Sequence, residues 1–123
     1  MNLPVITTHN IAELFNKEEI VLDTIKQIQK DFDMHGIELH FTGEVADAYR
    51  QMMQQLTEQM TRLLTYERSK LQSVLYRVDL SEKSLQKAIQ NTPDKTLPEV
   101  MAHEIIVREL KKVLTRHYFK SLE

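Results

Sequence analysis

The chain has 123 residues, of which 41% are hydrophobic and 28% charged, and its formal net charge is −2. These values are typical of one soluble domain, and they exclude a disordered chain and a global attraction to nucleic acid or membranes. The absence of Cys excludes disulfides and thiolate metal sites, and we find no signal peptide and no apolar run of membrane-spanning length. We therefore expect a cytoplasmic protein that does not associate with membranes.

The first ten residues form the least regular part of the sequence. They contain Pro4 and a short β-leaning run, so we expect residues 1–10 to be an irregular arm and residues 11–121 to be a single helical bundle domain. Asn16, with Glu19 three positions later, is typical of a helix N-terminus. Apolar residues recur at helical spacing up to Phe32, and Gly36 is placed to end this helix in a left-handed conformation.

Residues 37–41 alternate apolar and polar side chains with a period of two. This pattern predicts either an extended linker or a short strand. A single strand would have only the N-terminal arm to pair with, and isolated pairs of strands are marginally stable.

The longest helical pattern covers residues 43–78. After Gly43 it contains no Gly or Pro, and its apolar residues recur three or four positions apart, which predicts one long α-helix. If unbroken, this helix is a rod of roughly 52 Å. Glu67 occupies a position where an apolar residue is expected, so a kink or break within residues 65–69 is the alternative.

Two further helices are expected in the last third of the chain. Ser81 is placed as the N-cap of a short connector helix that ends before Pro93. Thr96 and Glu99 have the spacing of a capping box, and apolar residues continue at helical spacing to about Lys120.

These elements predict an all-α fold, an up-and-down helical bundle with one long central helix, a short connector helix and a long C-terminal helix. The other helices are too short to cover the long one, and an uncovered apolar patch usually marks an interface. A two-fold symmetric homodimer would cover it, whereas a broken helix would give a compact monomer. The expected interface residues all lie on the long helix and are Val45, Tyr49, Met52, Leu56, Met60 and Leu63.

The sequence contains no complete catalytic or metal-binding motif. Its two glycines cannot form a phosphate-binding loop. His103-Glu104 begins a zinc-protease motif, but the second His is missing because position 107 is Val. Glu99 and His103 share a helix face, yet a metal site needs three or four converging ligands. We therefore expect no catalytic residue, no metal and no cofactor.

A basic ridge on the last helix suggests a different function. Its four residues are spaced by four, and Tyr118 and Phe119 are interleaved with them, which suits phosphate contacts combined with base stacking. Cations near a helix C-terminus also complement the helix dipole, so a solvated face explains the same pattern. The possible nucleic-acid-binding residues are Arg108, Lys112, Arg116 and Lys120.

Two histidines lie on the apolar face of the last helix. His103 and His117 follow the spacing of its apolar residues, and Glu67 interrupts the apolar face of the long helix. A buried polar pair between Glu67 and one of these histidines would form an acid–base or pH-sensing site.

Taken together, these patterns predict a small helical module for self-association or protein–protein interaction, of the adaptor or regulatory-subunit type. The expected partners are a second copy of the chain and a possible protein partner. Nucleic-acid association through the basic ridge is the first alternative, and a pH-sensing site at Glu67 is the second.

Overall fold

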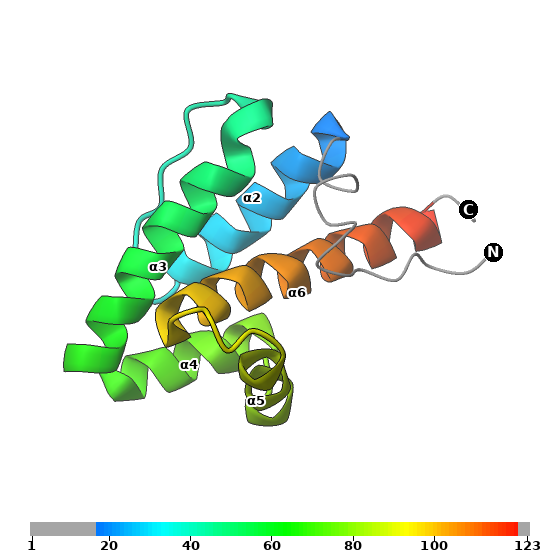
Figure 1. Cartoon of the computed structure of the whole chain (residues 1–123). Coiled ribbons are helices and arrows are strands. Elements are labelled where there is room, and N and C mark those ends of the chain that lie inside the picture. Colours follow the sequence, from blue (N-terminus) through cyan, green and yellow to red (C-terminus); the bar gives the residue numbers. More distant parts are fainter. Residues whose placement is uncertain (1–16, 121–123) are drawn as a thin grey trace.

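In the computed structural model, residues 17–120 are described, and they form an all-α fold without strands. Figure 1 shows the α-helices of this part of the chain, α2 to α6, gathered into one bundle. The irregular arm expected at residues 1–10 and the expected N-cap Asn16 lie outside the described residues. The elements are α2 (Glu18–Asp33), the short 3-10 helix η1 (Val45–Asp47), α3 (Ala48–Tyr66), α4 (Arg68–Val78), α5 (Glu82–Asn91) and α6 (Leu97–Lys120).

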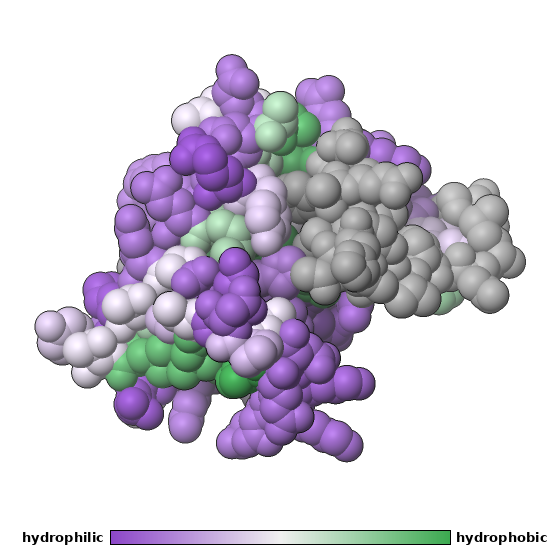
Figure 2. Space-filling model, viewed as in Figure 1, coloured by the Kyte–Doolittle hydropathy of each residue, from purple (hydrophilic) through white to green (hydrophobic). Residues whose placement is uncertain are grey.

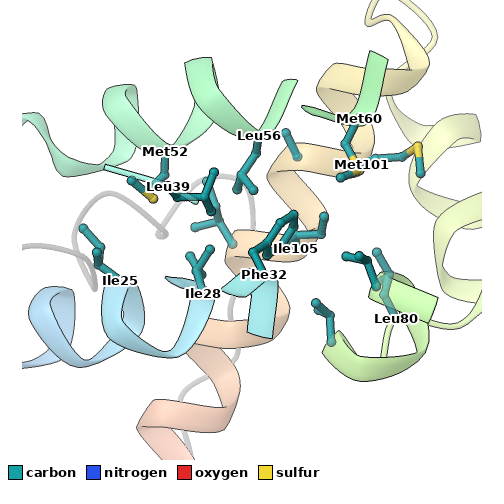
Figure 3. Close-up of a cluster of buried hydrophobic side chains, with 14 of the residues drawn as sticks. Ile25, Ile28, Phe32, Leu39, Met52, Leu56, Met60, Leu80, Met101 and Ile105 are labelled. Carbon is teal, nitrogen blue, oxygen red and sulfur yellow. The ribbon is translucent and has the colours of Figure 1, made fainter. Parts of the chain in front are cut away.

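The centre of the bundle is α6, which contacts α2, α3, α4 and α5. The apolar faces of these helices meet in one hydrophobic core, part of which is drawn in Figure 3. Phe32 of α2, Leu56 of α3 and Ile105 of α6 are fully buried there. The burial of such side chains is the main favourable contribution to folding, at about 1.5–3 kcal/mol for each large side chain.

The prediction of one continuous helix over residues 43–78 is wrong. The alternative prediction, a break within residues 65–69, is confirmed. Glu67 separates α3 from α4 with a non-helical backbone, at φ −143° and ψ 63°. A straight continuation of α3 would carry the apolar residues of α4 beyond the ends of α2 and α6. The break turns α4 back onto those helices, so that Leu71, Val74 and Val78 are buried.

Gly36 ends α2 as predicted. Its φ of +73° is one that L side chains rarely adopt, and the Ile37 amide donates to the Phe32 carbonyl over 3.0 Å. Residues 37–41 are extended and belong to no strand within the described chain, so the linker alternative holds. The Gln55 side chain of α3 bonds both the amide and the carbonyl of His40, which satisfies backbone groups that a strand partner would otherwise take.

The predicted helix starts in the last third of the chain are confirmed. Ser81 Oγ accepts a hydrogen bond from the Ser84 amide at the start of α5, and Thr96 Oγ1 accepts one from the Glu99 amide before α6. α5 nevertheless has no buried residue, and it lies at the periphery of the bundle (Figure 1). Among the described residues, no helix has both the length and the apolar character needed to cross a bilayer.

Candidate functional site

A groove of about 980 Å³ lies between α3, α5 and α6. Each helix contributes one face at helical spacing: Tyr49, Arg50 and Met53 from α3, then Ser84, Lys87, Ala88 and Asn91 from α5, and Val100, His103, Glu104, Val107, Arg108 and Lys111 from α6. The α4–α5 turn and the α5–α6 loop complete the walls. A volume of this size is at the upper end of the range for ligand-binding pockets.

At the floor of the groove, a tyrosine and a histidine side chain share a hydrogen bond. The Tyr49 hydroxyl lies 2.6 Å from His103 Nδ1, and the rings meet edge to face with centroids 6.0 Å apart. Burial lowers the pKa of His103, because it disfavours the imidazolium. Burial and the nearby Glu104 carboxylate raise the pKa of Tyr49. Both side chains are therefore uncharged at neutral pH, so this pair adds no charge to the floor of the groove.

Glu104 lies beside this pair. Burial raises the pKa of Glu104, and the positive charge of Lys111 acts in the opposite direction. The apolar side chains of Met53 and Val107 line the same groove and are half-buried. The groove thus combines an apolar base with a few polar groups that can fix the orientation of a bound chain.

The rim of the groove is basic. Five basic and three acidic residues line it, although the whole chain carries a net charge of −2. Arg50 and Arg108 are paired with Asp47 and Asp79. Lys87, Lys95 and Lys111 are exposed, and none of them has a carboxylate within ion-pair distance in residues 17–120. The lining therefore carries more basic than acidic side chains, and Glu99 and Glu104 offset only part of the positive charge.

The residues expected at a dimer interface lie mostly inside this chain. The broken helix lets α2 and α6 cover the apolar face of α3, which leaves four of the six side chains fully buried and inaccessible to a second copy. Val45 and Tyr49 are half-buried, and Tyr49 faces the groove. The four fully buried residues are Met52, Leu56, Met60 and Leu63.

The predicted basic ridge of α6 is not a continuous free surface. Arg108 donates to Asp79, Arg116 donates to Gln27 over 2.9 Å, and Lys112 Nζ lies 2.8 Å from the buried Glu109 carboxyl. Lys120 is exposed at the end of the helix. Because three of the four side chains are held by neighbouring helices or by the buried carboxyls, they are not arranged for a shared row of phosphate contacts.

The predicted polar pair between Glu67 and a histidine does not form. Glu67 instead binds Arg62 and Lys70 at the break between α3 and α4, and the hydrogen bond from Arg62 lowers the pKa of Glu67. His103 bonds Tyr49, and His117 Nε2 lies 2.7 Å from Asp23 Oδ2 of α2. Because the chain bends at Glu67, its side chain lies beside Arg62 and Lys70 and not against the face of α6 that carries the histidines.

A buried group of charged residues was missed by the sequence patterns. Glu109 and Asp31 are both buried where α2, α4 and α6 meet, with Arg77 Nε 3.2 Å from Asp31 Oδ1 and Lys112 beside Glu109. Burial and the neighbouring Asp31 raise the pKa of Glu109 to about 8, against the opposing effect of Lys112. The only sequence signal is that Glu109 lies between the buried positions 106 and 113 on α6, which is weak because carboxylates also flank apolar faces.

Glu99 and His103, which were considered as a pair of metal ligands, each bond a different residue. Glu99 accepts a hydrogen bond from Thr96 in the capping box, and His103 bonds Tyr49. Glu19, Asp23 and His117 instead bring three potential ligand atoms within 4.8 Å of one another. Glu19 and Asp23 are one turn apart on α2, but only the packing of α6 brings His117 to them.

No known protein family, no curated protein and no solved structure matches this chain. The groove and the charged groups around it are therefore the features of the molecule that indicate its function.

Proposed function

We propose that this chain is a protein-interaction module that binds an acidic, partly apolar segment of a partner protein in the groove between α3, α5 and α6. The observation that carries the proposal is that Lys87, Lys95 and Lys111 surround an apolar base and form no ion pair within residues 17–120. Acidic residues of a partner would lie against these lysines, and its apolar side chains would contact Met53 and Val107. Complementary charge of this kind favours specificity and fast association.

The construction of the groove suits a protein segment. It is open along one side and is bounded by α5, a helix without buried residues of its own. An amphipathic helix placed beside α5 and α6 would cover the half-buried apolar side chains of Met53 and Val107, and Figure 2 shows hydrophobic and hydrophilic residues side by side on one face of the molecule. Helix-in-groove recognition uses this combination of an apolar surface and a polar rim.

A nucleic acid is the alternative ligand of the groove, but the charges of the lining favour it less than an acidic peptide segment. Asp79, Glu99 and Glu104 line the same surface and would lie close to phosphates. The basic residues of α6 that would extend the contact are held by other side chains. Repulsion from carboxylates in the binding surface opposes phosphate binding.

Selection from a random-peptide display library on the purified protein tests the proposal. We expect the enriched peptides to combine Asp or Glu with Leu, Ile or Phe, and to bind more weakly as salt increases. Lys87→Glu with Lys111→Glu should weaken a selected peptide at least tenfold in fluorescence anisotropy. Lys26→Glu, an exposed change on α2 outside the groove, is the matched control and should leave the affinity unchanged.

Two results would contradict this function. One is enrichment of peptides without acidic residues, and the other is equal weakening by the groove variant and by the control. A labelled single-stranded oligonucleotide, measured with the same variants, tests the alternative. Binding of the oligonucleotide but of no peptide would identify the groove as a nucleic-acid surface.

A further inference from the structure

One group of potential metal ligands lies outside the groove. Glu19 and Asp23 project from successive turns of α2, and His117 approaches them from the last part of α6. One ligand atom from each residue lies within 4.8 Å of the other two, and His117 Nε2 is 2.7 Å from Asp23 Oδ2. None of these residues lines the groove, so this group is independent of the proposed function.

We propose that Glu19, Asp23 and His117 bind a divalent transition-metal ion of the Zn²⁺ type across α2 and α6. One imidazole and two carboxylates form a donor set that suits Zn²⁺ and similar ions. In a tetrahedral site with bonds of about 2.0–2.1 Å, neighbouring ligand atoms lie about 3.3 Å apart. This value lies between the 2.7 Å that separates His117 Nε2 from Asp23 Oδ2 and the 4.8 Å limit that holds for all three ligand atoms. Water would fill the fourth position.

The surroundings favour a cation. Two carboxylates balance the two charges of the ion. The dipole of α6 favours positive charge near His117 in its last turn, while the dipole of α2 opposes it near Glu19 in its first turn, so these two effects offset each other. Glu19 is exposed and has no side-chain hydrogen bond or ion pair within residues 17–120, so it can move toward an ion without breaking one. The half-buried His117 and Asp23 are already adjacent through their hydrogen bond, and an ion bound to both atoms would take the place of the shared hydrogen, which is released to solvent. Ligands that are largely in place lose little conformational freedom on binding.

An ion at this position would join the first described helix to the last. Because α2 and α6 form one of the main helix contacts of the bundle, a bridge between them stabilises the folded state over the unfolded one. The expected signature is therefore both binding and a rise in thermal stability.

Titration of the metal-free protein with ZnCl₂ tests the site. After treatment with a chelator and its removal, isothermal titration calorimetry should give one Zn²⁺ bound per chain, and the melting temperature should rise with Zn²⁺. His117→Ala should weaken binding at least tenfold, and Glu19→Gln should weaken it several-fold. The imidazole nitrogen resonances of His117 should shift on addition of one equivalent of Zn²⁺.

His40→Ala is the matched control, because His40 is an exposed histidine outside the cluster. Glu19→Gln should leave the fold intact, since the exposed Glu19 side chain forms no hydrogen bond or ion pair in the described chain. Unchanged Zn²⁺ affinity in both His117→Ala and Glu19→Gln would overturn the proposal. So would the absence of binding by the wild-type protein at submillimolar Zn²⁺, which would leave the Asp23–His117 contact as an interhelical hydrogen bond only.

Discussion

The least expected residue in this protein is Glu109 of α6, whose carboxyl group is fully buried. A charged carboxylate would be costly in this position, and its neighbours offset the cost only in part. Asp31 comes from α2, Arg77 from α4 and Lys112 from α6, so two acidic and two basic groups share the site. The raised pKa of about 8 means that Glu109 holds its proton at neutral pH.

Glu109 therefore predicts a dependence of stability on pH. Its pKa is about 8 in the folded state and near 4.5 when it is free, so the folded state holds the extra proton between these values. The contribution to stability is fully present below pH 4.5 and is lost as the pH rises toward 8, by about 1.4 kcal/mol per pH unit at most. Glu109→Gln removes this titration. Urea unfolding at pH 5, 7 and 9 should show the wild-type protein losing stability relative to the variant.

Glu58→Gln is the control for this measurement, because Glu58 is an exposed carboxyl of α3. Its stability should follow that of the wild-type protein across the pH range. Parallel curves for the wild type and Glu109→Gln would show that the buried carboxyl stays ionised and is neutralised by Lys112 and Arg77.

At the scale of the elements, α5 is the helix held least firmly. It contacts α6 but buries none of its residues. It begins at the Ser81 cap and ends at Asn91, followed by a turn that contains Pro93. Local stability follows buried apolar contact, so α5 should open more readily than α6. A weakly held helix that forms one wall of the groove could adjust to partners of different size.

Loss of the Ser81 cap should destabilise α5. Ser81→Ala leaves the Ser84 amide without its hydrogen bond, at a cost of about 0.5–2 kcal/mol, typically near 1. Hydrogen exchange read by mass spectrometry should show faster exchange in residues 82–91 and little change in α6. Ser73→Ala, at an exposed mid-helix position in α4, is the control and should leave exchange in α5 unaltered. Equal acceleration in all helices would mean that α5 opens only with the whole bundle.

At the scale of the whole molecule, the break at Glu67 determines how the apolar surface is covered. Two helices of 19 and 11 residues replace one rod, and both fit against α2 and α6. The length mismatch that led us to expect a homodimer is thereby removed. The oligomeric state itself is a question for light scattering on a sizing column, at low and high salt.

Leu56→Asp distinguishes a core position from an interface between copies. Leu56 is fully buried within the chain, and an unpaired carboxylate there costs several kcal/mol, a large share of the usual 5–15 kcal/mol of stability. We expect circular dichroism to show an unfolded variant. Ile89→Asp, on the exposed side of α5, is the control and should remain folded. A Leu56→Asp chain that stays folded but changes from dimer to monomer would instead support the interface expected from the sequence.

Part of this architecture follows from the sequence because it depends on local interactions. The helical spacing of apolar residues, Gly36 after α2, the Ser81 cap and the Thr96–Glu99 pair all act within a few residues. Even the break near Glu67 has a local signal, since a polar residue interrupts the apolar face there. The all-α fold and the starts of α5 and α6 were therefore predictable, whereas α3 begins at Ala48 and not at the expected Gly43.

The candidate sites could not be predicted in the same way, because each joins residues that are far apart in the chain. Tyr49 meets His103, Asp31 meets Glu109, and Asp23 meets His117 only after the helices have packed. The sequence by itself determined which residues form helices and which faces are apolar. Tertiary packing alone decided which polar groups are buried together and which lysines remain without a counterion, because helical spacing fixes a face but not the helix that covers it.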